Sequence, residues 1–275
     1  MHIVVPIKQV PETSNVKMDP ETGTMLRTAV AGIVNPMDLY AIEAALRMRE
    51  THGGSITLIS MGPPSAESAL RDGLSMGCDR AVLLTDRRFG GSDTWATSYT
   101  LSLAIKKLAP VDLIICGERA TDGETGQVGP GIAANLDLPL ATYVTRIVEI
   151  GVDHLKVERM VEEGRELIWS PVPMVLVVTK EVGEPRLGTV RSKLQARKVE
   201  IPTWGPETIG AKEEWIGLKG SPTRVVKIYS PKLARKGELL CIQNQEDLEK
   251  AGIAFVQFLK DRDLVDLIHH AKGRS

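Results

Sequence analysis

Short apolar runs alternate with longer stretches of helical periodicity through the first part of this chain. HIVVPI, SITLISMG, RAVLLTD and VDLIICGE are rich in β-branched residues, and each is bounded by Gly, Pro or Asp. Runs of this length and composition predict buried β-strands. Because helical patterns lie between them, the order of elements predicts an α/β fold, with a mostly parallel sheet and helices on both faces.

The pattern places the start of one helix at VNPMD, residues 34–38. Asn35 is a favourable N-cap residue, Pro36 suits the first helical position, and Asp38 puts a negative charge near the positive end of the helix. A second helix is expected from Ser65 to the stop at Gly77.

A third helix is expected after FGG, with Ser92 as its cap and Asp93 and Thr94 in its first turn. Asp93, Thr94 and Thr97 would then supply polar groups near the ligand end of the sheet. Ordinary N-terminal capping is the alternative role for these side chains, and the residues alone leave both interpretations open.

The pattern changes near Ala141, where apolar and polar residues begin to alternate around turns at 151–153 and 163–164. Alternation of this kind predicts antiparallel strands at the edge of the sheet. Beyond Pro185, Pro and Gly recur at short intervals until a helical pattern begins near residue 244. We therefore expect an α/β domain over 1–183, followed by an extended arm with a terminal helix over 184–275.

Composition narrows the classes of partner. Of 275 residues, 34 are Lys or Arg and 35 are Asp or Glu, so no overall positive charge would attract nucleic acid. The N-terminus lacks the pattern of a signal peptide, and no apolar run is long enough to span a membrane, so we expect a cytoplasmic protein without direct membrane insertion. Three cysteines far apart suggest no metal site.

Residues 116–131, CGERATDGETGQVGPG, contain five glycines and follow the strand that ends near Cys116. In open α/β sheets, ligands bind beyond the carboxyl ends of strands. Glycines let the backbone approach a ligand closely, and the N–H groups at the start of the next helix, near Val128, favour an anion. The stretch therefore predicts a phosphate site without a lysine, the alternative being a glycine-rich crossover. It matches neither the dinucleotide motif nor the P-loop.

Four motifs together resemble one family: VNPMD (34–38), SMGCDRAVLL (75–84), GERATDGETGQVGP (117–130) and EPRLGTVRSKLQARKVEI (184–201). In this order and spacing the sequence resembles the small, beta subunit of electron transfer flavoproteins. The resemblance implies a nucleotide-binding α/β domain of the adenine-nucleotide-hydrolase-like, Rossmann type. It also implies a heterodimer with a larger alpha subunit, whose own FAD exchanges electrons with partner enzymes.

That family has two branches, and two further stretches resemble the bifurcating one: RRFGGSDTWATSYTLSLAI (87–105) and GLKGSPTRVVKIYSP (217–231). Membership there implies a second FAD that takes hydride from NADH and sends electrons to a high-potential acceptor and to a low-potential one, such as ferredoxin or flavodoxin. The alternatives are an ordinary electron carrier with structural AMP, or a non-redox nucleotide-binding module. Ser92 stands where Ala is common in the bifurcating branch, and this small difference leaves the helix start intact.

The resemblance also implies the cofactor-binding residues. They flank the adenine, open the third helix or form the loop: Pro6, Asn35, Pro36, Met37, Asp38, Met61, Asp93, Thr94, Thr97, Gly117, Glu118, Arg119, Ala120, Thr121, Asp122, Gly123, Glu124, Thr125, Gly126, Gln127 and Val128. No catalytic side chain is expected, because hydride transfer to a flavin is the chemistry of the cofactor. Any NADH oxidation is expected only in the complex.

The segment RLGTVRSKL (186–194) resembles the recognition loop of the family, with Val190 at the position of its apolar anchor. Arg191 and Lys193 are neighbouring cations. An exposed apolar residue among cations predicts a contact for an acidic redox partner of the dehydrogenase or quinone-reductase type, which could recruit the complex to a membrane-associated assembly. An ordinary basic loop is the alternative.

Overall fold

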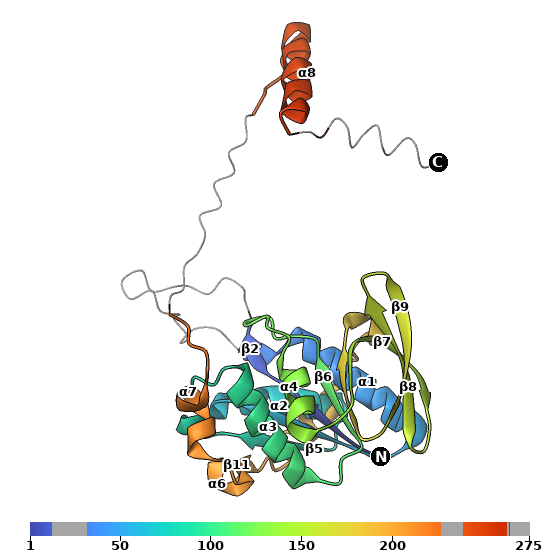
Figure 1. Ribbon diagram of the computed structural model, residues 1–275, viewed down its shortest axis with the longest axis vertical. Helices are drawn as coiled ribbons and strands as arrows, with labels where there is room; N and C mark the ends of the chain where they lie inside the picture. The colour runs from blue at the N-terminus through green and yellow to red at the C-terminus, as the bar shows by residue number, and fades with distance from the viewer. Residues whose placement is uncertain (13–31, 227–238, 263, 265–275) are drawn as a thin grey trace. The chain divides into compact units, whose positions relative to one another are not determined.

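The computed structural model of the chain describes residues 1–12, 32–226, 239–262 and 264. The chain divides into two compact units, Met1–Ile228 and Tyr229–Ser275, and each is considered by itself. The first unit contains the sheet, the helices around it and the short elements of residues 184–226 (Figure 1).

Within the described residues, nine strands form one sheet in the order β11-β5-β4-β1-β6-β10-β7-β8-β9. Neighbouring strands are parallel from β11 to β7, whereas β7, β8 and β9 pair antiparallel, as expected. Their bounds are β1 His2–Pro6, β4 Ser55–Met61, β5 Arg80–Leu84, β6 Leu113–Gly117, β7 Leu140–Ile150, β8 His154–Val161, β9 Gly164–Pro171, β10 Met174–Val178 and β11 Thr203–Trp204. A separate antiparallel pair joins β2 Gln9–Pro11 to β3 Gly32–Val34. The predicted α/β fold with antiparallel edge strands is confirmed.

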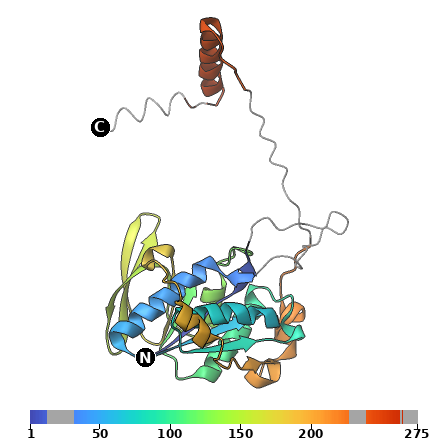
Figure 2. The ribbon, with the colours of Figure 1, turned by 180° about the vertical axis from the view of Figure 1, so that it is seen from behind.

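Helices cover both faces of the parallel region, and two apolar clusters fill the space beneath them. The first cluster joins one face of the sheet to α1 (Pro36–His52) and α2 (Glu67–Met76). Figure 2, which views the molecule from behind, shows this face. The second cluster joins the other face to α3 (Thr94–Leu108) and α4 (Val128–Leu136). Because both faces are covered, the central strands are buried along nearly their whole length, which explains their continuous apolar runs.

Two helix starts differ in detail from the sequence expectation. Asn35 does occupy the position before α1, with Pro36 first in the helix, but its side chain makes no capping bond. The cap of α3 is Asp93, whose Oδ1 accepts a hydrogen bond from the N–H of Ala96 at 3.0 Å. Ser92 instead donates its hydroxyl to the carbonyl of Phe89 at 2.8 Å, so the expected cap is displaced by one residue.

Residues 184–226 contain more regular structure than an extended arm. They form α5 (Val190–Ala196), β11, α6 (Pro206–Ile209) and α7 (Gly217–Gly220), with β11 paired to β5. Arg186 connects this segment to α1 by a salt bridge with Glu43, in which Arg186 Nε and Glu43 Oε2 are 2.8 Å apart. Short 3₁₀ helices lie at Pro64–Ala66, Arg87–Phe89, Lys180–Val182 and Glu213–Trp215.

The second unit contains the expected terminal helix, α8 (Gln245–Lys260). Asn244 caps it by accepting a hydrogen bond from the N–H of Asp247 at 2.9 Å. Ile253 and Val256 are exposed within the unit.

The strand order decides where a ligand can enter. From β1, the chain adds β4 on one side and β6 on the other, so the crossovers diverge at β1. In doubly wound sheets such a divergence leaves a crevice beyond the carboxyl ends of the strands. Pro6, Met61 and Gly117 end the three strands at this crevice.

Candidate functional site

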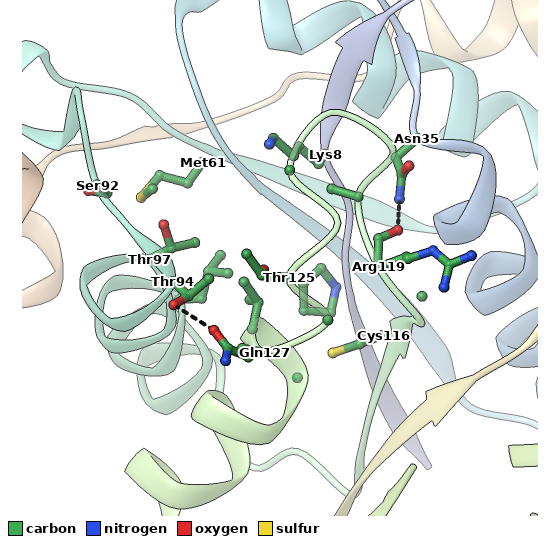
Figure 3. A pocket seen from close by; sticks show the side chains of 18 of the residues that line it. Lys8, Asn35, Met61, Ser92, Thr94, Thr97, Cys116, Arg119, Thr125 and Gln127 are labelled. Carbon is green, nitrogen blue, oxygen red and sulfur yellow. Dashed lines mark hydrogen bonds between the residues drawn. The ribbon is translucent and has the colours of Figure 1, made fainter. Parts of the chain in front are cut away.

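A cavity of about 600 Å³ lies at this crevice (Figure 3). Its volume is within the range of small-molecule and cofactor sites. Its walls come from the ends of β1, β4 and β6, the start of α1, the start of α3, the loop 117–127 and the segment after α7. The lining residues are Pro6, Ile7, Lys8, Asn35, Asp38, Met61, Phe89, Gly91, Ser92, Asp93, Thr94, Thr97, Leu101, Cys116, Gly117, Glu118, Arg119, Ala120, Gly123, Thr125, Gly126, Gln127, Val128, Gly129 and Thr223.

Most of the residues that the family resemblance implied therefore border one cavity, although they come from five separate parts of the sequence. Five of them do not line it: Pro36, Met37, Thr121, Asp122 and Glu124. Pro36 and Met37 form the first turn of α1, and the other three belong to the loop. Glu124 borders a smaller hollow on Tyr143 and Thr142 of β7.

The loop 117–127 is shaped by close approach at one end and by left-handed backbone at the other. A Cβ atom on Gly117 would lie 2.4 Å from Asp38 Oδ1 and 2.7 Å from the Met37 carbonyl, so only glycine lets the loop leave β6 against α1. Gly126 has φ +62°, a conformation that glycine adopts without strain. Gly123 differs from both, because a Cβ there would meet no protein atom within 4 Å.

The loop leads directly into α4, whose first N–H groups have no partner within the helix. Backbone N–H groups at a helix start attract a phosphate. Thr125 and Gln127 add neutral polar groups, and Gln127 Oε1 accepts a long hydrogen bond of 3.3 Å from Thr94 Oγ1 (Figure 3). The arrangement suits a nucleotide phosphate bound mainly by backbone.

The opposite wall is the start of α3, and it includes a segment that is distant in sequence. Asp93 Oδ2 accepts hydrogen bonds from the N–H and the hydroxyl of Thr223, at 3.0 and 2.8 Å. The N–H of Asp93 donates to Ser221 Oγ at 2.8 Å. Asp93 therefore joins the segment after α7 to the start of α3, while Thr94 and Thr97 provide hydroxyl groups at the cavity.

Asp38 is the buried acid of the site, with 7% of its surface exposed. Its Oδ2 accepts a hydrogen bond from the N–H of Lys8 at 2.7 Å. Burial raises the pKa of Asp38 from its usual 3.8 to about 7, because a charged carboxylate is poorly solvated there.

We expect Asp38→Asn to change the pH dependence of stability. Between about pH 4 and pH 7 the folded protein keeps the Asp38 proton that the unfolded chain releases, so rising pH favours unfolding until about pH 7. Asparagine cannot ionise and still offers an oxygen to Lys8. The difference in free energy of unfolding, variant minus wild type, should therefore increase from pH 5 to pH 8, by an amount on the order of 2 kcal/mol. Urea titrations of the purified protein at both pH values measure this increase. A difference between variant and wild type that does not vary with pH would contradict the prediction.

Several lining residues were missed by sequence reasoning. Lys8 lies two positions after Pro6, so the end of the first strand could have indicated it. Phe89 and Gly91 belong to the stretch 87–105, which the family resemblance had already singled out. Cys116 immediately precedes the loop, and burial raises the pKa of its thiol, which keeps it neutral. Thr223 lies within 217–231, a stretch that the family resemblance singled out, but nothing in that stretch indicated its bonds to Asp93.

The residues expected to dock a partner do not line this cavity, and they lie on α5. Thr189 caps α5 by accepting a hydrogen bond from the N–H of Ser192 at 3.1 Å. Val190 begins the helix with 78% of its surface exposed, and Arg191 and Lys193 are also exposed.

Two classes of feature are absent from the part of the chain that the structure describes. No group of three or more His, Cys, Asp or Glu side chains could hold a metal ion there. Nor is any helix in those residues long and apolar enough to cross a membrane.

The sequence matches the family described as "Electron transfer flavoprotein domain" over residues 22–208. "Electron transfer flavoprotein subunit beta" of Thermoanaerobacterium thermosaccharolyticum is 48% identical over 240 residues, covering 87% of this chain and 92% of the relative. "Protein FixA" of Azotobacter vinelandii is 44% identical over 247 residues, covering 87% and 88%. "Caffeyl-CoA reductase-Etf complex subunit CarD" of Acetobacterium woodii is 44% identical over 268 residues, covering 96% and 100%. The family match includes Asn35, the loop and α5, and it ends before Thr223.

Proposed function

Since this chain belongs to the electron transfer flavoprotein family, as a small, beta subunit, we propose that it oxidises NADH by hydride transfer to an FAD bound in the cavity. In this proposal it works as a heterodimer with an alpha subunit and divides the electron pair between two acceptors. The high-potential route runs through the FAD of the alpha subunit, and the low-potential route leads to a carrier such as ferredoxin or flavodoxin.

The observation that carries the proposal is the extent of the cavity beyond the phosphate loop. From the loop it continues to Phe89, Thr97 and Thr223, on the opposite wall. A nucleotide monophosphate held by the loop would leave this second region unused, whereas a dinucleotide has a further ring system to place there. The mixture of apolar walls and a few hydroxyl groups is typical of cofactor sites.

In this arrangement the protein binds and orients. The loop N–H groups and the start of α4 hold phosphate, the glycines permit the close approach, and Thr94 and Thr97 offer hydrogen bonds to polar ring atoms. Phe89 and Leu101 provide apolar surface in the far region of the cavity. A bound FAD would supply the hydride-accepting chemistry, so no side chain needs to act as a nucleophile.

The second candidate function is an ordinary electron carrier with AMP in the same cavity. The loop supports it, because a phosphate cradle beside the start of α1 would serve any adenine nucleotide equally well. A non-redox nucleotide-binding module is the weakest alternative, because the family match includes α5 and the start of the arm, up to residue 208, which a self-contained nucleotide module would not need.

Partners follow from the same proposal. The arm from residue 184 onward is proposed to pack on the alpha subunit. In α8, the exposed Ile253 and Val256, together with Leu259, would add apolar contact area. The name of the Acetobacterium relative places that protein in a caffeyl-CoA reductase complex. For this chain we propose a dehydrogenase or quinone-reductase-type partner that docks through Val190. The complex is proposed to be cytoplasmic and to be recruited by membrane-associated partners.

The cofactor content of the purified heterodimer tests the proposal. Denaturing the complex and separating the released nucleotides should give about two FAD and almost no AMP per heterodimer, because each subunit would hold one flavin. NADH should reduce the complex, and it should not reduce the isolated small subunit. One FAD with one AMP would instead assign this chain to the ordinary electron carriers.

A further inference from the structure

Asn35 is fully buried beside the cavity, and its side chain is committed to the loop. Asn35 Nδ2 donates a hydrogen bond to the Arg119 carbonyl at 2.8 Å, drawn in Figure 3. Asn35 Oδ1 accepts a hydrogen bond from the N–H of Thr121 at 3.1 Å. An N-cap side chain would accept from the second or third N–H of its helix instead, and Asn35 makes no such bond.

We propose that Asn35 is the positioning residue of the loop: its amide fixes residues 119–121 in the shape that receives the nucleotide. Asn35 then contributes to affinity through the loop rather than through a bond of its own to the ligand. The identity of the ligand rests on the proposed function, whereas the effect on the loop does not depend on it.

The chemistry of the amide explains why asparagine stands here. Arg119 offers a carbonyl and Thr121 offers an N–H, so the partner must carry a donor and an acceptor side by side. Aspartate would lack the donor, and serine would be too short to reach both groups. Without Asn35, the Arg119 carbonyl and the Thr121 N–H, which are partly buried at these bonds, would lose their partners within the protein.

The other described side-chain bonds from the loop to neighbouring elements are weaker. Lys8 Nζ and Asp122 Oδ1 lie 2.6 Å apart, but both side chains are partly in solvent, at 48% and 29% exposed. Exposed pairs of this kind contribute little to stability. The Thr94–Gln127 bond is neutral and long at 3.3 Å. The buried Asn35 amide is therefore the main fixed point of the loop among these contacts.

A loop fixed before the nucleotide arrives binds it with a smaller loss of conformational entropy. Releasing the loop should therefore have two separate effects: the loop opens more often when the cavity is empty, and more nucleotide is needed to close it. Arg119 lies within the loop and provides a trypsin cleavage site, so both effects can be measured at one peptide bond.

The test is limited trypsin digestion of the purified heterodimer after nucleotide removal, comparing wild type with Asn35→Ser. Serine is also a good N-cap, so the substitution suits the helix start while its shorter side chain does not reach the loop. Cleavage after Arg119 should rise about tenfold, because proteolysis follows the population of the open form when opening is fast. AMP and FAD, added separately as probes, should slow this cleavage in both proteins, with half-protection at roughly tenfold higher nucleotide in the variant.

Two matched variants show that the effect is specific. Asn135→Ser removes a comparable bond, from Asn135 Nδ2 to the Gly131 carbonyl at 2.8 Å within α4, and should leave cleavage after Arg119 unchanged. Lys8→Gln removes the exposed ion pair and should change it less than twofold.

Wild-type cleavage and wild-type half-protection in Asn35→Ser would overturn the proposal. If that variant does not fold, judged by circular dichroism, Asn35→Gln keeps a neutral amide, displaces it from Arg119 and Thr121 by one carbon, and is compared with the wild type by the same two measurements. Recovery of AMP instead of FAD from the wild-type complex would refute only the proposed function, since the cleavage of the emptied protein is independent of it.

Discussion

Replacing Gly123 by valine should remove one nucleotide from the complex and abolish NADH oxidation while leaving the protein folded. Gly123 lines the cavity, and a Cβ at this position would meet no protein atom within 4 Å, so the valine would add bulk at the cavity without a clash inside the protein. The released nucleotide should fall from about two FAD to about one, the remaining flavin belonging to the alpha subunit. Because the added side chain meets no protein atom, the free energy of unfolding of the complex without nucleotide should change by less than about 0.5 kcal/mol. Thermal unfolding measures this change.

Two other loop variants should have different effects, and they serve as comparisons for Gly123→Val. Gln127→Ala removes a side chain and should weaken nucleotide binding only about threefold to tenfold, the worth of one neutral hydrogen bond. Gly117→Ala should destabilise the protein even without nucleotide, because its Cβ would press on Asp38 and Met37. Two intact flavins in Gly123→Val would show that the loop is not part of the cofactor site.

Replacing Val190 by aspartate should slow electron delivery to the partner dehydrogenase by about tenfold to a hundredfold while NADH still reduces the bound flavin at the normal rate. Val190 is largely exposed on α5 between cations, so its loss affects docking and not the cavity. Truncating a hot-spot residue at the centre of an interface costs about 2 kcal/mol or more. Stopped-flow reduction by NADH and steady-state transfer to the partner separate the two steps.

Val152→Asp is the matched control, because Val152 is fully exposed in the turn between β7 and β8, far in sequence from α5. It introduces the same charge and should leave both steps unchanged. An equal loss of both activities in Val190→Asp would count against the docking role of α5.

Local patterns predicted the sheet because each central strand is buried on both faces and must be apolar throughout. They also predicted the place of the loop, since the carboxyl end of a strand followed by glycines has a clear geometric meaning. The roles of Asn35 and Ser92 were predicted less well. Both residues are good caps, but Asn35 bonds a loop 84 residues away, and the cap of α3 is Asp93.

Long-range contacts account for most of what the sequence did not reveal. The segment after residue 184 appeared extended because its prolines and glycines interrupt every periodic pattern. Its structure comes from partners elsewhere in the chain: β11 pairs with β5, and Arg71 Nη1 donates to the Ala196 carbonyl at 2.7 Å. Thr223 lies in the stretch 217–231 that the family resemblance singled out, but its place at the cavity wall depends on bonds to Asp93, which its sequence neighbours do not indicate.

The lining of the cavity begins at Pro6 and ends at Thr223, so it uses nearly the full length of the first unit. A shorter fragment would lack one wall, and the unfolded chain has none of them. A nucleotide bound here consequently stabilises the whole unit by mass action, adding about 2.7 kcal/mol when its free concentration is a hundred times its dissociation constant. Under the proposed function, the cofactor that equips this subunit to carry electrons would therefore also protect it from unfolding.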